Sequence, residues 1–147
     1  MTGGDDRVRL HVYEQFVAAG RPPTAAETAA ALGLDEEEAA DAYRRLADAH
    51  VIVLEPGTTD VWMASPLSAV PTPFPVETER GSFYGNCIWD GLGTVTMLGA
   101  SGRVETSCPD CREPLVFTVR GGELEPVDAV VHYAVPAAHW WDDIGFS

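Results

Sequence analysis

The amino-acid sequence predicts an α+β fold in which short helices come first and a small, mostly antiparallel β-sheet follows. Apolar residues recur at helical spacing in the N-terminal part, whereas short β-rich runs bounded by Gly and Pro dominate the C-terminal part. A proline-rich stretch separates the two patterns. With 147 residues, the chain is long enough to bury a sizeable core without disulfides.

The N-terminal part begins with two predicted helices. The first runs from Asp6 to Ala19 and stops at Gly20, which precedes a pair of prolines. The second opens with a capping box, in which the side chains of Thr24 and Glu27 each accept a hydrogen bond from the other residue's backbone N–H. Gly33 is placed to end this helix as a C-terminal cap.

A third helix and two short strands follow. Asp35 and Glu38 repeat the capping box, and the helix is expected to continue through His50. The face that it buries is expected to contain Ala39, Tyr43, Leu46 and His50. Strands are predicted at residues 51–54 and 61–63, on either side of a Pro-Gly turn.

This order of three helices and a two-stranded wing predicts a winged-helix-like module over residues 1–65. Such modules often bind DNA through the third helix. DNA binding is disfavoured here, because residues 1–55 carry eleven acids against five arginines, of which only Arg44 and Arg45 lie on the third helix. A net charge of −14 repels nucleic acid and anionic membranes alike. We therefore expect neither as a partner.

A linker is predicted over residues 66–80, and a second domain over residues 81–147. The prolines between Pro66 and Pro75 exclude a regular helix and favour an extended connector. The strands expected in the second domain cover residues 102–107, 115–120 and, from 127 or 128, up to 135.

The stretch Gly85-Asn86-Cys87-Ile88-Trp89-Asp90-Gly91 carries the most promising chemistry. If a helix begins at Asn86, Cys87 and Asp90 project from the same face of its first turn. The partial positive charge of a helix start favours the thiolate form of Cys87, next to an acid that can hold and release a proton. The alternative is that Cys87 is a small buried apolar residue.

The three cysteines and the start of the chain indicate a reducing compartment. The first six residues lack the basic and then apolar pattern of an export signal, so we expect a cytoplasmic protein. In that compartment, three cysteines indicate metal binding or chemistry rather than disulfides.

A second candidate site is the CxxC turn Cys108-Pro109-Asp110-Cys111, whose two thiols can bind one soft metal ion such as zinc. A closed zinc site needs further ligands, and nothing in the spacing favours the candidates Cys87, His132 and His139. A reduced turn with one or both thiols buried is the alternative. A thioredoxin-like redox role is weaker, because the turn lies between predicted strands.

The chain closes on an aromatic and acidic stretch, Trp140-Trp141-Asp142-Asp143-Ile144-Gly145-Phe146. This stretch is expected either to cap the core or to form a wall of the site. We expect Trp89, Trp140 and Trp141 to be the apolar walls of a substrate pocket.

Residues 85–90, 102–108 and 140–146 together resemble the corresponding stretches of the alkylmercury (organomercurial) lyases. The resemblance covers roughly residues 6–147 and is most specific over residues 84–120. Members of that family carry a winged-helix-like N-terminal module followed by a catalytic domain with antiparallel strands, which is the order predicted above.

The resemblance implies protonolytic cleavage of a carbon–mercury bond in a small organomercurial substrate. It implies no added cofactor, small thiols as partners and Hg(II) as the product ion. In the family, a cysteine that matches Cys87 binds mercury and a carboxylate that matches Asp90 carries the proton to carbon, which suits the softness of Hg(II). The cysteine that matches Cys108 is structural in the family, and Cys111 is an addition.

The sequence also departs from the family. The second active-site cysteine of the family comes shortly after the segment that matches Ile144 to Phe146, and this chain stops at Ser147. We therefore expect either a truncated chain or a protein without that thiol.

Two other functions stay open. The first is a non-catalytic soft-metal protein or sensor that binds Hg, Cu or Zn through Cys87, Cys108 and Cys111. The second is a family-related enzyme that uses Asp90 for other proton-transfer chemistry on a small molecule.

Overall fold

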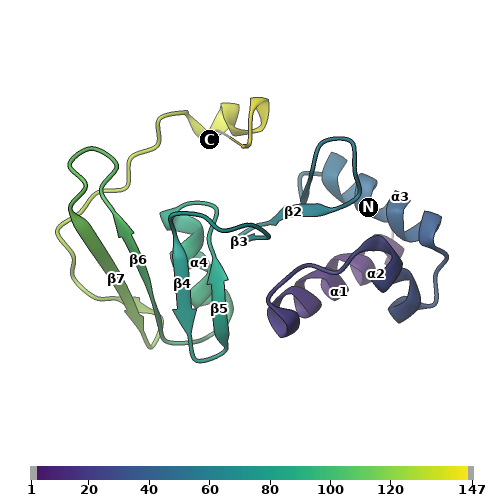
Figure 1. The fold of residues 1–147 in the computed structure, drawn as a ribbon, viewed down its shortest axis with the longest axis horizontal. Helices are drawn as coiled ribbons and strands as arrows, with labels where there is room; N and C mark the ends of the chain where they lie inside the picture. The colour runs from purple at the N-terminus through teal and green to yellow at the C-terminus, as the bar shows by residue number, and fades with distance from the viewer. Residues whose placement is uncertain (1–2, 146–147) are drawn as a thin grey trace.

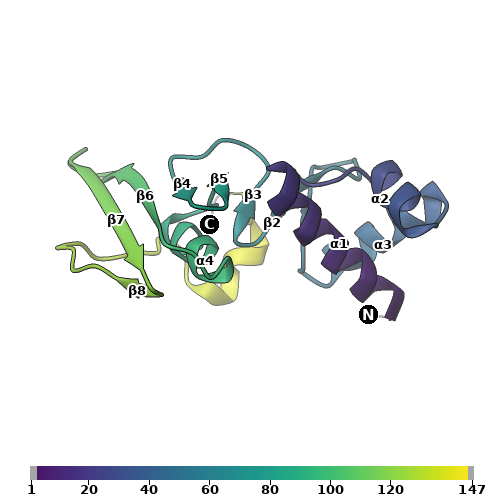
Figure 2. The same ribbon diagram turned by 90° about the horizontal axis from the view of Figure 1, so that it is seen from below.

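The computed structural model of the protein describes residues 3–145 and has the predicted α+β class (Figure 1). Three helices lie at one end of the molecule, and a five-stranded sheet with a single helix lies at the other (Figure 2). Phe146 and Ser147, at the end of the expected C-terminal motif, lie outside the described residues, as do Met1 and Thr2.

The three N-terminal helices begin and end close to the predicted residues. They are α1 (Gly3–Ala19), α2 (Ala25–Leu32) and α3 (Glu36–Asp48). Both capping boxes are confirmed, since the N–H of Glu27 donates to Thr24 Oγ1 at 3.1 Å and that of Glu38 donates to Asp35 Oδ1 at 2.7 Å. Gly33 ends α2 at a φ of 68°, a left-handed conformation that glycine adopts without strain.

The third helix is shorter than predicted. Ala39, Tyr43 and Leu46 are buried as expected, but α3 ends at Asp48 and His50 is exposed. His50 has a φ of 59°, which takes the chain out of the helix before it reaches the buried face.

The strands that follow the helices form a small antiparallel sheet in the order β1-β2-β3. These strands are β1 (Val53–Leu54), β2 (Val61–Ala64) and β3 (Leu67–Ser68). The expected two-stranded wing therefore gains a third strand, and the winged-helix-like character of this region stays a prediction.

The range 66–80, predicted as an extended linker, contains two short strands that belong to different sheets. It supplies β3 to the first sheet and β4 (Pro75–Thr78) to the second. The prolines permit this because Pro75 is the first residue of its strand, where a missing backbone N–H is tolerated.

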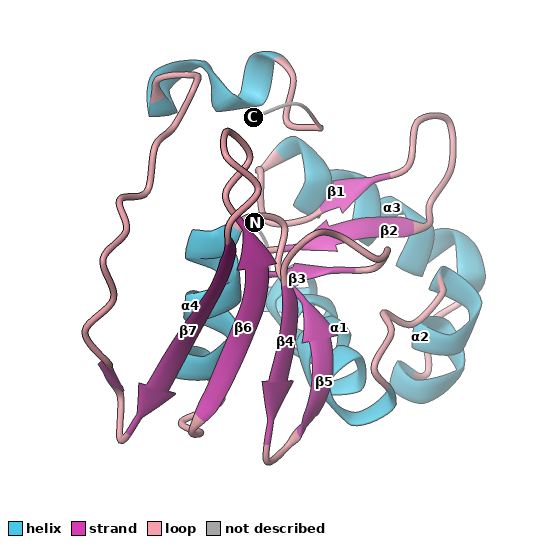
Figure 3. Ribbon diagram, turned by 60° about the vertical axis from the view of Figure 1, so that its left-hand side comes forward, coloured by secondary structure: helices cyan, strands magenta, loops and turns pink. Residues whose placement is uncertain are grey.

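The second sheet is antiparallel and has the strand order β5-β4-β6-β7-β8 (Figure 3). Its remaining strands are β5 (Gly81–Tyr84), β6 (Gly102–Ser107), β7 (Pro114–Arg120) and β8 (Glu123–Leu124). The predictions for 102–107 and 115–120 are confirmed. The strand predicted up to residue 135 is wrong, because residues 127–135 form an irregular segment in which Val130 is 92% exposed.

A row of apolar side chains crosses four strands of this sheet at one level. Val76 is paired with Phe83 on one side and with Val104 on the other, and Val104 is paired with Phe117. All four are buried. Helix α4 (Ile88–Met97) packs on β4, β6 and β7 and covers this row.

Gly91 is the point at which α4 touches the row. A Cβ atom at this position would lie 3.1 and 3.2 Å from the two methyl carbons of Val104 and 3.6 Å from a methyl carbon of Val76. The missing side chain therefore lets the helix backbone approach the sheet closely.

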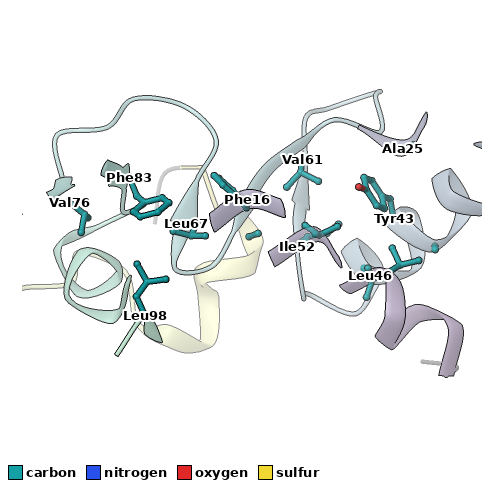
Figure 4. Packing of buried hydrophobic residues seen from close by; sticks show 14 of the residues in the cluster. Phe16, Ala25, Tyr43, Leu46, Ile52, Val61, Leu67, Val76, Phe83 and Leu98 are labelled. Atoms are coloured by element: carbon teal, nitrogen blue, oxygen red, sulfur yellow. The ribbon is translucent and has the colours of Figure 1, made fainter. Parts of the chain in front are cut away.

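The two halves of the molecule share a continuous apolar core (Figure 4). Leu67, which is fully buried, lies between Phe16 of α1 and the Phe83 side chain of the second sheet. A hydrogen bond adds to this junction, since the Tyr13 hydroxyl donates to the Ser65 carbonyl oxygen at 2.9 Å.

The C-terminal segment crosses back from the second sheet to the N-terminal half (Figure 1). It contains the 3₁₀ helix η1 (Ala137–Asp142). Trp141 stacks on His50 with a centroid distance of 3.8 Å and an interplanar angle of 6°. Gly145 packs directly against the Trp62 ring, because a Cβ there would lie 2.7 Å from that ring.

We predict that Gly91→Ala destabilises the protein although alanine is the better helix former. The added methyl overpacks Val104, and overpacking of a core costs about 1–3 kcal/mol. The matched control is Gly93→Ala in the same helix, where the new Cβ would make an ordinary contact of 3.5 Å with Pro66. That variant should be as stable as the wild type or gain up to about 1 kcal/mol.

Urea unfolding of both variants measures this difference. Equal free energies of unfolding for Gly91→Ala and Gly93→Ala would show that the close approach of α4 to the sheet is not needed.

Candidate functional site

Cys87 is the N-cap residue of α4, as the sequence predicted for a helix that starts at this point. Its backbone is extended, with φ −141° and ψ −178°, and its Sγ accepts a hydrogen bond from the Asp90 N–H at 3.4 Å. Cys87 and Asp90 therefore lie together on the first turn of the helix, and both are half-buried.

Gly85 fixes the backbone that leads into this turn. Its N–H donates to the Phe74 carbonyl oxygen at 3.0 Å, and its own carbonyl oxygen accepts from the Thr72 hydroxyl at 2.6 Å. A Cβ at this position would lie only 2.4 Å from the Gly91 nitrogen. Only glycine fits at this position, because the obstacle is the backbone of α4 itself.

The Asp90 carboxyl group is suited to hold a proton. Burial raises the pKa of Asp90 above its usual value, and the hydrogen bond from Asn86 lowers it in part. In that bond Asn86 Nδ2 donates to Asp90 Oδ2 at 3.0 Å. The other amide atom, Asn86 Oδ1, is buried and has no hydrogen-bond partner among the described residues. A rotated amide would let Oδ1 accept from a protonated Asp90, so Asn86 can serve both forms of the acid.

The helix start lowers the pKa of Cys87, as predicted, but burial outweighs it and the net pKa of this thiol is raised. Burial raises the pKa of Cys87, and the negative charge of Asp90 adds to this effect. The N–H groups of Asp90 and Trp89 donate to the sulfur and lower the pKa, but they offset the burial only in part. Cys87 is therefore a thiol whose proton needs an acceptor, and Asp90 is the acid beside it.

Two tyrosines near the site were not predicted. The pKa of Tyr133 is raised by burial first and then by the negative charges of Cys87 and Asp90, so its hydroxyl lies within electrostatic range of both. The charge of Asp90 also contributes to the raised pKa of Tyr13 on α1. Neither tyrosine is near Cys87 in sequence, whereas Asn86 could have been found from its i, i+4 spacing to Asp90.

The three tryptophans expected to line a pocket lie in different surroundings. Trp140 packs on Tyr133 with a centroid distance of 5.2 Å, and its indole N–H donates to the Val135 carbonyl oxygen at 2.8 Å. Trp89 follows Cys87 on α4 but is 64% exposed. Trp141 lies on His50 of the N-terminal half. Of these contacts, the one between Trp140 and Tyr133 involves the tyrosine beside the site.

The CxxC motif forms the turn between β6 and β7, as predicted. Hydrogen bonds from the backbone N–H of Cys111, and then of Asp110, lower the pKa of Cys108. Within residues 3–145 no three His, Cys, Asp or Glu side chains gather closely enough to hold a metal ion. The expected metal set of Cys87, Cys108 and Cys111 is therefore not assembled, and neither His132 nor His139 completes a zinc site.

The two arginines on α3 that could have met DNA are paired within the protein. Arg45 binds the buried Asp5 at 2.8 Å, and Arg44 pairs with Asp41. In the part of the chain that is described, no helix combines the length and apolar character needed to cross a bilayer.

Comparison with known proteins decides the family. The family model of MerB, alkylmercury lyase, matches residues 67–146, which is more than half of the chain and includes Cys87 and Asp90. The chain belongs to the alkylmercury lyase family. This is an enzyme family, and the resemblance seen in the sequence is confirmed.

Solved structures support the same fold. Ten chains match, among them a crystal structure of the mercury-bound form of MerB2, with a TM-score of 0.65 and 21% identity. The match covers 81% of this chain and 58% of the MerB2 chain, so this chain spans less than two thirds of that protein's length. No curated protein sequence matches.

We predict that Asp90→Asn is more stable than the wild type at pH 7 and that this advantage shrinks in acid. A carboxyl group whose pKa is raised on folding costs the folded state stability when ionised. At a pH above the pKa of Asp90 in the folded protein, this loss of stability is complete. It vanishes as the pH falls to the pKa of Asp in the unfolded chain, which is about 4. Urea unfolding at several pH values measures it.

Two further variants define the effect. Asp60→Asn removes an exposed negative charge. It therefore measures how the stability of a chain of net charge −14 changes when any one acidic side chain is neutralised. Asn86→Ala removes the hydrogen bond that lowers the pKa of Asp90, so its stability should fall more steeply as the pH rises. A pH dependence shared by Asp90→Asn and Asp60→Asn would argue against a raised pKa at Asp90.

Proposed function

We propose that this protein cleaves carbon–mercury bonds by protonolysis, with Cys87 as the mercury-binding sulfur and Asp90 as the proton carrier. The observation that supports this most is the contact between the two residues, in which the Asp90 N–H lies 3.4 Å from Cys87 Sγ. A sulfur ligand and a proton-holding acid on one helical turn can act on the two atoms of the same bond.

The first step is capture of the organomercurial. In a reducing compartment the substrate is an alkylmercury ion bound to a small thiolate. The Cys87 thiol transfers its proton to the Asp90 carboxylate, and the sulfur forms a bond to the soft Hg(II). The small thiolate stays on the metal, so two sulfur ligands increase the electron density on the carbon.

The second step breaks the bond. Asp90 gives its proton to the carbon, and the electron pair of the Hg–C bond becomes the new C–H bond. The hydrocarbon leaves, and Hg(II) stays bound to Cys87 and the small thiolate. No electron is gained or lost by the metal, and the proton that left Cys87 ends on carbon.

The surroundings of Asp90 suit this role. Burial raises the pKa of Asp90, and an acid whose pKa is closer to the working pH is the better proton carrier. Burial also raises the pKa of Cys87, so that its proton is not lost to water before the substrate arrives. Asn86 holds the carboxyl group through a 3.0 Å hydrogen bond.

The organic group of the substrate would lie against apolar walls. Trp140 is the best supported of the three predicted tryptophans, because it packs on Tyr133. The negative charges of Cys87 and Asp90 contribute to the raised pKa of this tyrosine. Trp89 and Trp141 stay predictions as wall residues. We propose the cytoplasm as the place of action, since the activity uses small thiols and free cysteines.

We predict that the protein releases methane from methylmercury in excess small thiol and that Cys87→Ser releases none. Asp90→Asn should be slower by about 100-fold or more, the usual contribution of a general acid, while still binding the substrate. Headspace gas chromatography measures the methane.

Asp60→Asn is the control, since it removes the same charge from an exposed position. Absence of methane from the wild type, or an equal rate from Cys87→Ser, would refute the proposed activity.

A further inference from the structure

The turn that carries Cys108 and Cys111 is built by the backbone. Ser107 and Pro114 form the last pair of the β6–β7 ladder. Beyond them, the Cys108 N–H donates to the Glu113 carbonyl oxygen and the Arg112 N–H donates to the Cys108 carbonyl oxygen, both at 2.9 Å. Backbone hydrogen bonds therefore hold this turn, independently of whether the two thiols are free or bound to a metal ion.

The backbone turn brings Cys108 and Cys111 close together, since the Arg112 N–H that follows Cys111 donates to the Cys108 carbonyl oxygen. The N–H groups of Cys111 and Asp110 and the Cys111 thiol lie close enough to Cys108 to lower its pKa. Cys108 is half-buried and Cys111 is exposed. A dissolved ion can therefore reach both sulfurs, and the exposed Cys111 side chain can rotate to set their separation.

The number of available ligands selects the ion. Zinc in a structural site takes four ligands, and among the described residues no third His, Cys, Asp or Glu joins the two sulfurs. Hg(II) differs, because this soft ion forms a stable, nearly linear complex with two thiolates. The two sulfurs would then lie on opposite sides of the ion. Their separation would be about twice the mercury–sulfur distance, which slightly exceeds the ~2.3 Å of a zinc–sulfur bond.

We propose that Cys108 and Cys111 form a second thiol site, separate from Cys87, that binds one Hg(II) ion between two thiolates. The ion arrives as a complex with two small thiolates. Each protein thiol gives its proton to one of these small thiolates, and two small thiols leave. The two bonds between Hg(II) and the small thiolates break, and two bonds from Hg(II) to Cys108 and Cys111 form. No oxidant or reductant is needed.

The position of this site suits an ion that comes from Cys87. Strands β5 and β6 are both antiparallel to β4, and so they point to the same edge of the sheet (Figure 3). Cys87 follows the end of β5, and Cys108 follows the end of β6. Binding of Hg(II) by the turn does not depend on the proposed lyase activity, so each can fail without the other.

The test uses the full chain with Cys87→Ser as the background. Inorganic Hg(II) is offered with excess 2-mercaptoethanol, the protein is desalted, and native mass spectrometry counts the bound ions. We expect one Hg(II) per chain of Cys87→Ser. The double variant Cys87→Ser/Cys111→Ser should retain at least 100-fold less, because one thiolate cannot compete with the small thiol in excess.

The matched control is Cys87→Ser/Asp110→Asn, which alters the same turn but keeps both sulfurs and should still bind one ion. Circular dichroism checks that each variant is folded, which is expected since Cys111 is exposed. The proposal is overturned if Cys87→Ser binds no Hg(II), or if Cys87→Ser/Cys111→Ser binds as much as Cys87→Ser.

Discussion

The arrangement of the candidate site depends on the close packing of α4 on the second sheet at Gly91. A paired row of Val76, Phe83, Val104 and Phe117 makes the surface on which the helix lies. Glycine at position 91 brings the helix backbone within methyl contact of Val104. Gly85, where only a hydrogen atom fits against that backbone, ties the end of β5 to the same turn. Two glycines therefore determine where the first turn of α4 begins.

The chemistry of the site follows from this placement. A helix start that is pressed against a sheet is partly buried, and burial raises the pKa of both Cys87 and Asp90. The pair therefore holds its proton rather than releasing it to water. Asn86 binds the acid, and Tyr133 brings the C-terminal segment close to it. That segment also contacts the N-terminal half, because Trp141 stacks on His50.

The local features of this fold could be predicted from the sequence, and the long-range ones could not. Capping boxes such as Thr24–Glu27 depend on residues three apart, and the Cys87–Asp90 spacing works in the same way. The strand expected up to residue 135 failed, because strand propensity does not reveal whether a partner strand is present. The thiolate prediction for Cys87 failed because the helix-start effect is local, whereas the burial that outweighs it comes from the packed fold. Family resemblance supplied the mercury chemistry, which residue patterns alone left among several alternatives.

In the proposed reaction, Asp90 delivers a proton, and not an electron or a radical, to the carbon of the substrate. The most direct measurement is mass spectrometry of the gas that is released from methylmercury when the protein works in D₂O with excess small thiol. The Cys87 and Asp90 protons exchange with solvent, so the proposed protonolysis yields methane that carries a single deuterium atom. Unlabelled methane, or ethane from the joining of two methyl radicals, would contradict it.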